Sequence, residues 1–285
     1  MTAIRVAAPL AGLMLVGALL SGCAAEPAPS GQPTRTGQPI PSGPPIPVYY
    51  IGQTPAGPRL FREFEPDADP ASDRGSLAVR ELLTRPVGND PDYRSAWPPG
   101  WAAAAPVGHA DGVITVDLRP PPGAPGPSEP KLATLGIQQL VYSVQDALTS
   151  TDPVRILLNG QPADLLWGAP IRAPIARAEP TATRALVQID QPGQGAVFTS
   201  STVRVRGDAA AFEATVLWQV LRGSTVVAHG HATAAEAFSF SPYEFSVRLA
   251  PGRYTVRVYE SDESDGEGRP PFADTKDITV LAGGK

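Results

Sequence analysis

The part of the chain after residue 184 most restricts the fold, because it alternates short β-forming runs with turn residues and contains no helical stripe. Such runs recur about every 8 to 15 residues, with Gly, Pro and Asp between them, as is typical of a β-sandwich. They occupy residues 186–189, 202–206, 215–221, 225–231, 243–249, 254–259 and 274–281. The sequence therefore predicts an all-β sandwich over residues 185–285, with Trp218 packed between its sheets.

Residues 48–167 show a mixed pattern, in which β-like and helical runs alternate. Residues 48–51 and 60–64 favour strands, and the turn residues between them predict a hairpin. Apolar residues in the segment 75–85 recur at helical spacing, and Pro86 ends that pattern. We therefore expect a hairpin followed by a helix.

A longer helix is predicted over residues 137–148, whose apolar residues form one stripe at helical spacing. Residues 112–118 and 154–158, on either side of this helix, read as strands. The dipeptide Asn159-Gly160 is a strong signal for a tight turn. Together these elements predict an α+β domain with two helices on one face of a sheet.

The first 23 residues differ from the rest of the chain. Arg5 is their only charged residue, and residues 6–20 are apolar or small, a run of signal-peptide length that is short for a membrane-spanning helix. Leu20-Ser21-Gly22-Cys23 has the pattern of a bacterial lipoprotein signal, with small residues before the cut and a thiol that accepts the diacylglyceryl group. We therefore predict a signal peptide over residues 1–22 and lipidation of Cys23, the only cysteine. The alternative is a plain signal anchor with a buried cysteine.

Residues 24–47 are dense in Pro, Gly and Ser, and residues 168–184 are rich in Pro and small residues. The first is predicted to be a linker that lifts the folded part off the bilayer, and the second a linker or a strap. The expected order is a signal peptide (1–22), the lipidated Cys23 with its linker (23–47), the α+β domain (48–167), the second linker (168–184) and the sandwich (185–285).

Composition excludes some classes of function. The chain has 23 Lys and Arg against 28 Asp and Glu, which excludes a basic nucleic-acid binder as an interpretation of the whole chain. A single cysteine excludes an internal disulfide framework and a cysteine-based zinc site. The hydrophobic fraction of 42% is sufficient for folded cores.

Three aromatic residues, Tyr93, Trp97 and Trp101, lie in a Pro-rich segment that the pattern predicts to be a long loop. Aromatic side chains beside proline can stack on sugars or anchor a partner protein. The alternative is that they cover the core of their own domain. The sequence therefore marks these three residues as a candidate binding site and leaves both interpretations open.

Two features of the sandwich region suggest metal ligands only weakly. His229 and His231 share one face of a predicted strand, but a metal site needs a third ligand, and His109 lies in the other domain. The acidic run 260–267 contains D-x-x-D-G without the spacing of a helix-loop-helix calcium site. We therefore expect surface histidines and no metal site, and the acidic run is either a solvated loop or a weak calcium site.

No catalytic set emerges from the sequence. Glu63, Glu65, Asp67 and Asp69 could suggest paired carboxylates, but we expect them on a solvated, charged loop. The chain contains no G-x-S-x-G nucleophile elbow and no G-x-x-x-x-G-K-[ST] loop. We therefore predict no catalytic residue and no cofactor.

Residues 48–167 resemble the GerMN domain of sporulation and spore-germination proteins. Four segments that follow one another at similar spacing carry this resemblance: ELLTRP (81–86), DGVITVDL (111–118), QLVYSV (139–144) and VRILLNG (154–160).

Residues 186–281 resemble the Gmad2 domain, an immunoglobulin-like module often found beside GerMN. The matching segments are Gln191-Pro192, VRVRG (203–207), AFEA (211–214), PYEF (242–245) and ESDESDG (260–266). The resemblance implies that the predicted sandwich is immunoglobulin-like.

The two resemblances imply a non-catalytic envelope lipoprotein, and related GerMN proteins are tied to sporulation channels and to sensor-kinase regulation. We therefore expect a scaffold or adaptor that is lipid-anchored on the extracytoplasmic side of the cell membrane and contacts an unknown envelope protein. The alternative is a lipoprotein that binds cell-wall polysaccharide or peptidoglycan through Tyr93, Trp97 and Trp101. No enzyme activity and no nucleic-acid partner are expected.

Overall fold

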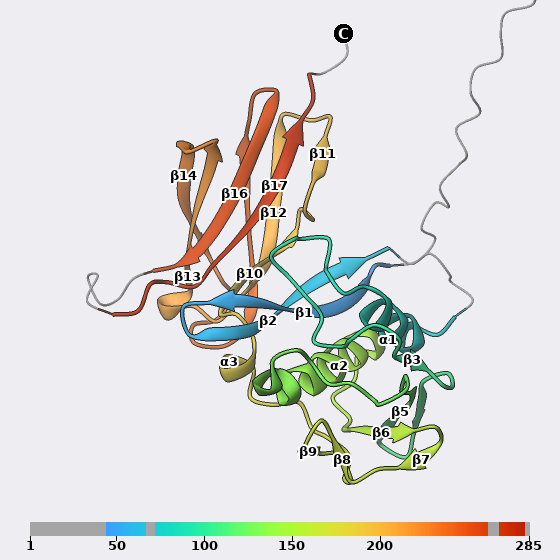
Figure 1. The fold of residues 1–285 in the computed structure, drawn as a ribbon. Coiled ribbons are helices and arrows are strands. Elements are labelled where there is room, and N and C mark those ends of the chain that lie inside the picture. Colours follow the sequence, from blue (N-terminus) through green and yellow to red (C-terminus); the bar gives the residue numbers. More distant parts are fainter. Residues whose placement is uncertain (1–43, 67–71, 262–267, 283–285) are drawn as a thin grey trace, which may run out of the picture. The chain divides into compact units, whose positions relative to one another are not determined.

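The computed structural model describes residues 44–66, 72–261 and 268–282 (Figure 1). Residues 39–285 form one compact unit. Residues 1–38, which include Cys23, lie outside the described residues. No helix in the described ranges is long and apolar enough to cross a bilayer.

The first domain combines a hairpin, two helices and a small sheet. Its elements are β1 (Ile46–Thr54), β2 (Gly57–Glu65), α1 (Arg74–Thr84), β3 (Ala102–Ala103), β4 (Gly108–Ala110), β5 (Val113–Arg119), the 3-10 turn η1 (Pro130–Leu132), α2 (Ala133–Leu148), β6 (Val154–Leu158) and β7 (Gln161–Pro162). The small sheet has the order β3-β5-β6-β7, with β4 also paired to β5. Strands β5 and β6 are parallel, so the chain between them crosses over through α2.

The α+β class is confirmed and both helices lie on a small sheet, as expected, but the strands of this domain form separate sheets and not one. The β1–β2 hairpin is a separate two-stranded sheet, and both helices pack against β1 (Figure 1). The predicted helix boundaries are close to those observed: Asp73 caps α1 by accepting a hydrogen bond from the backbone N–H of Ser76 at 2.7 Å. Helix α2 begins four residues before its predicted start, at Ala133.

Helix α2 is buried on most of its sides, including polar residues that an amphipathic stripe would expose. Two of them bind the open edge of β1: the backbone N–H of Tyr49 donates to Ser143 Oγ at 2.8 Å, and Gln139 Nε2 donates to the Tyr49 carbonyl at 2.8 Å. A buried backbone group without a partner is costly, so these side chains take the place of a third strand.

Residues 168–184, expected to be a linker or a strap, lie along α2. Gln138 on this helix bonds the backbone of Ala176 and Ala178, and Ile175 pairs with Val154 of β6. Strand β8 (Leu165–Leu166) comes just before this segment, which contains β9 (Ala169–Pro170) and the one-turn helix α3 (Pro180–Thr183). The segment is therefore a strap fixed to the first domain.

The second domain is a sandwich of two sheets, ordered β10-β12-β15 and β11-β17-β16-β13-β14. Its strands are β10 (Val187–Gln191), β11 (Ala196–Phe198), β12 (Thr202–Ala209), β13 (Thr215–Arg222), β14 (Thr225–Thr233), β15 (Ser241–Arg248), β16 (Gly252–Glu260) and β17 (Ala273–Val280). Every predicted run corresponds to a strand. The sequence missed β11, which has only three residues and pairs in parallel with β17.

Trp218 packs between the two sheets, as predicted. Its ring stacks on Phe245 of the facing sheet, with centroids 4.5 Å apart and planes 5° from parallel. Gly230 on the neighbouring strand makes room, because a Cβ atom there would lie 2.5 Å from the indole.

Candidate functional site

The predicted aromatic site is not on the surface. Tyr93, Trp97 and Trp101 are only 4%, 2% and 2% exposed. The Trp97 indole N–H donates to the Gly136 carbonyl at 2.9 Å, and both tryptophan rings pack against Trp167. This burial favours the alternative that the sequence left open for Trp97 and Trp101, which fill the core of their own domain, whereas the buried Tyr93 also contacts the second domain.

The expectation of a solvated loop at Glu63 and Glu65 is wrong. Both lie on strand β2 and are buried. The Glu63 carboxylate accepts hydrogen bonds from the backbone N–H groups of Asn89 and Asp90, at 2.8 and 2.9 Å. Asp67 and Asp69 fall outside the described residues.

The remaining candidates add no ligand cluster. His229 and His231 are exposed on β14, and no group of three or more His, Cys, Asp or Glu side chains in the described ranges could hold a metal. Most of the acidic run 260–267 lies outside those ranges, as does Cys23.

The two domains meet along strand β2. The backbone N–H of Ala185 donates to the Leu60 carbonyl at 3.0 Å, and the backbone N–H of Arg62 donates to Gln188 Oε1 at 3.3 Å. We call this region the junction. It comprises residues 60–65 and 89–93 of the first domain, and residues 184–190 and 274–276 at the start and end of the second.

A buried lysine lies at the centre of the junction. Lys276 of β17 is 2% exposed, and its Nζ lies 2.6 Å from Asp90 Oδ2, 3.0 Å from the Tyr93 hydroxyl and 3.5 Å from Asp274 Oδ1. The ammonium also lies 4.1 Å from the centroid of the Tyr93 ring. Tyr93 donates to Asp274 at 2.5 Å. We call Glu63, Asp90, Tyr93, Asp274 and Lys276 the lysine cluster.

In the lysine cluster one ammonium group faces three carboxyl groups. Burial raises the pKa of Asp274, and Lys276 and the Ile189 N–H offset this effect only in part. Burial also raises the pKa of Glu63, against the backbone N–H groups of Asp90 and Asn89. Burial alone would lower the pKa of Lys276, but Asp274 and Asp90 raise it above the ordinary lysine value. The charged form of the lysine is therefore favoured, while burial disfavours the ionised forms of Asp274 and Glu63.

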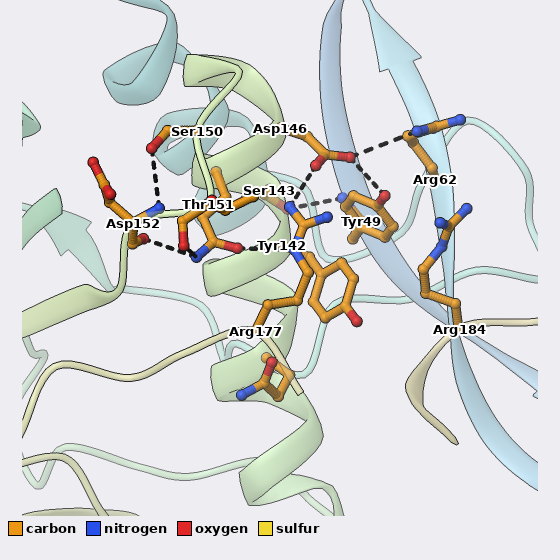
Figure 2. Close-up of polar contacts among 12 residues, drawn as sticks. Tyr49, Arg62, Tyr142, Ser143, Asp146, Ser150, Thr151, Asp152, Arg177 and Arg184 are labelled. Carbon is orange, nitrogen blue, oxygen red and sulfur yellow. Dashed lines mark hydrogen bonds and ion pairs between the residues drawn. The ribbon is translucent and has the colours of Figure 1, made fainter. Parts of the chain in front are cut away.

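A second ionic group, at the Asp146 side of β2, contains arginines (Figure 2). Arg62 bonds Asp190 of the second domain with two nitrogens, at 2.7 and 3.3 Å. Asp146 accepts from the Tyr49 hydroxyl at 2.7 Å and from Arg177 at 2.5 Å. Although burial alone would raise it, the pKa of Asp146 lies below the ordinary value because of Arg177 and Tyr49.

An open groove outside the junction lies in the first domain. It has a volume of about 640 Å³ and runs between helix α1 and the edge strand β3 of the small sheet. Its walls are mostly apolar or small and include Leu77, Leu83, Thr84 and Ala102–Ala105. An open, largely apolar groove beside a strand edge can receive an extended peptide.

The sequence analysis missed the lysine cluster, although β17 carried a signal for it. Asp274 and Lys276 alternate in step with Ile278 and Val280, so period two places two charged residues on the buried face of a strand. Charges on a buried face need partners. Their partners in the first domain lie more than 180 positions away in the chain, which no local pattern could reveal.

Two family models match the chain. Residues 47–164 match the Germane model, described as sporulation and spore germination. Residues 186–267 match the Gmad2 model, described as an immunoglobulin-like domain of bacterial spore germination. No curated protein matches the chain.

Solved structures show weaker similarity. The tandem GerMN domains of the sporulation protein GerM from Bacillus subtilis have 14% identity and a TM-score of 0.39, over 51% of this chain and 50% of theirs. This chain thus spans about half the length of that structure. The CARDB domain of a Pyrococcus furiosus protein, in complex with di-metal ions, has 13% identity and a TM-score of 0.24, over 34% and 91%. Scores of this size do not establish a common fold.

Replacing the buried lysine tests whether its cluster holds the junction together. Lys276→Met removes the only cation within the cluster and leaves buried carboxylates unpaired, so we expect the free energy of unfolding to fall by about 3–5 kcal/mol. The exposed Lys131→Met serves as the control and should leave the urea midpoint unchanged. Equal midpoints for the two variants would show that the pairing contributes nothing.

Stability should depend on pH with a predictable sign. The pKa values of Glu63, Glu65 and Asp274 are raised by burial, so the folded chain binds more protons than the unfolded chain as pH falls toward the ordinary values of 4.5 and 3.8. The free energy of unfolding should therefore rise from pH 8 to pH 5, as measured by urea titration. Glu65→Gln should reduce this slope, whereas Glu129→Gln, at a half-exposed carboxylate paired with Arg94 and Lys131, should not. A slope of opposite sign would contradict the assignment.

Proposed function

We propose that this chain, whose residues 47–164 match the Germane model and residues 186–267 the Gmad2 model of spore germination, is a non-catalytic adaptor of the cell envelope. In this proposal Cys23 carries a lipid anchor on the extracytoplasmic side of the cell membrane, and the folded part binds another envelope protein.

The junction carries this proposal. Its charged groups bind one another across the two domains: the buried Lys276 with Asp90, and the half-buried Arg62 with Asp190. Groups that are engaged in this way fix the relative position of two modules, whereas a catalytic site needs titratable groups that meet a substrate. Two domains joined by such contacts suit a protein that presents surfaces to partners.

The groove between α1 and β3 is the surface on which we propose that the partner binds. Its small and apolar walls fit an extended protein segment, which could also pair with the edge of β3. The groove belongs to the Germane domain and does not include any residue of the lysine cluster.

The anchor is supported by the sequence alone. The only cysteine follows an apolar segment and two small residues, and thioether-linked acyl chains bind a bilayer stably when two or more are present. The alternative function, binding of cell-wall polysaccharide or peptidoglycan, loses its proposed residues because Tyr93, Trp97 and Trp101 are buried.

Lipidation is tested by metabolic labelling with palmitate. We expect Cys23→Ala to abolish the label, because the acceptor thiol is lost, while Ser21→Ala keeps it, because a small residue remains before the cut. Labelling of Cys23→Ala at the level of the original chain would refute the anchor without affecting the adaptor proposal.

The adaptor proposal is tested by photocrosslinking in intact cells. A photoreactive residue in place of Thr84, which is exposed on the groove wall, should capture one envelope protein, and the same residue in place of the exposed Gln161 should not. Adding Ala104→Trp to the Thr84 variant fills the groove and should abolish the product.

Two results would overturn the groove as the partner surface. One is a product that persists when Ala104→Trp fills the groove; the other is equal capture from Thr84 and Gln161. Retention of the full chain on purified cell wall, unaffected by Ala104→Trp, would favour wall binding instead.

A further inference from the structure

The contact between Lys276 and Asp90 places an amine against a carboxyl group in a site that excludes water. Lys276 Nζ lies 2.6 Å from Asp90 Oδ2, and the two side chains are only 2% and 3% exposed. Two groups that are held together in this way react as if they were at very high concentration, because folding has already removed their freedom to move apart. The reaction open to an amine and a carboxylic acid is the formation of an amide with loss of water.

The second carboxyl oxygen of Asp90 is positioned for the same reaction. Asp90 Oδ1 accepts a hydrogen bond from the backbone N–H of Asp92 at 3.0 Å. A backbone N–H in this place stabilises the negative charge that develops on a carbonyl oxygen when a nucleophile adds to its carbon. The two oxygens therefore differ: Oδ1 is suited to remain as the carbonyl oxygen, and Oδ2, beside the amine, is suited to leave.

A third group lies close enough to move the protons. Asp274 Oδ1 lies 3.5 Å from Lys276 Nζ, and the Tyr93 hydroxyl lies 3.0 Å from the same nitrogen. Tyr93 also donates to Asp274 at 2.5 Å and so fixes its carboxyl group beside the lysine. Because burial raises the pKa of Asp274, its protonated form is favoured. A buried carboxylic acid next to the reacting atoms can act as a general acid.

We propose that Lys276 and Asp90 form an amide bond that joins the two domains covalently. Asp90 first takes a proton from the ammonium group, which gives a neutral amine and a neutral carboxylic acid. The amine nitrogen attacks Cγ of Asp90, the bond from Cγ to Oδ2 breaks, and Oδ2 leaves as water with a proton from Asp274. The nitrogen returns a proton to Asp274, so the acid is regenerated and nothing is oxidised or reduced.

The amide suits the buried cluster better than the two ions that it replaces. The reaction removes one positive and one negative charge from a site where each charge is costly. The carboxyl groups that remain are those of Asp274 and Glu63, whose ionised forms are disfavoured by burial. After the reaction the lysine cluster therefore no longer needs a cation.

The water that the reaction releases can leave the cluster. A pocket of about 440 Å³ opens at the junction, and its walls include Glu63, Asn89 and Lys276. The reacting lysine thus lies at the boundary between a dry cluster and a pocket that is open to solvent.

Another lysine shows why burial is required. Lys131 Nζ lies 3.3 Å from a carboxylate oxygen of Glu129, but the lysine side chain is 72% exposed. Solvated ions of this kind stay ionised and mobile, so we expect no amide between them. This pair provides a control within the same chain.

Trypsin digestion of the full chain, followed by mass spectrometry, tests the bond. Acylation of Lys276 blocks cleavage after it, so we expect residues 81–94 joined to residues 258–285, lighter than the two separate peptides by one water molecule. Fragmentation should locate the link between Asp90 and Lys276. Cleavage after Lys131 should proceed as usual.

Replacement of the proton donor gives a second measurement. Asp274→Asn keeps the shape of the side chain but removes the carboxylic proton, so the linked product should form at least about tenfold more slowly. The control Glu129→Gln, outside the lysine cluster, should form it at the rate of the original chain. The linked fraction is followed in samples taken at intervals after synthesis.

A chain that unfolds cooperatively in urea, and is therefore folded, but yields residues 81–94, 258–276 and 277–285 with no linked product would overturn the proposal. A link between any other two residues would overturn it as well, and equal rates for Asp274→Asn and Glu129→Gln would refute the role of Asp274. The reaction involves neither the groove nor the acyl anchor. Its failure therefore leaves the proposed adaptor function standing, and failure of that function leaves the amide standing.

Discussion

The structure depends on the removal of one ammonium group from water. A buried lysine costs several kcal/mol unless other groups replace its hydration, and around Lys276 those groups are Asp90, Asp274 and the ring and hydroxyl of Tyr93. Asp274 comes from the same strand as the lysine, but Asp90 and Tyr93 come from the other domain. The second domain alone would therefore leave its own lysine incompletely paired.

The same need to satisfy buried polar groups explains the unusual composition of α2. A two-stranded hairpin has open edges, and the inner edge of β1 lies in the core of the first domain. Gln139 and Ser143 supply the hydrogen bonds that another strand would have made, and Gln138 does the same for the backbone of the strap. The helix is thus a polar connector between two backbone segments, so its apolar stripe describes only part of its role.

Local periodicity predicted most of the fold but little of the site. Apolar residues at period two predicted every long strand, and apolar stripes at helical spacing predicted both long helices. Such patterns arise because one face of each element packs against a core. The burial of Glu63 and of Trp97 could not be read in this way, since proline and charge nearby are typical of solvated loops. Their place depends on contacts with residues far along the chain, such as Asn89 with Glu63 and Gly136 with Trp97. The three-residue β11 was too short to carry a period.

The strap and the junction also bear on how such proteins can evolve. Modules joined by a free tether can be exchanged one at a time, because neither depends on the surface of the other. Here the connecting segment is bonded to α2, and the charge of Lys276 is matched by a residue of the preceding domain. Recombination with a foreign second domain would leave Asp90 buried without its cation. The two domains are therefore expected to be inherited together and to diverge as a pair.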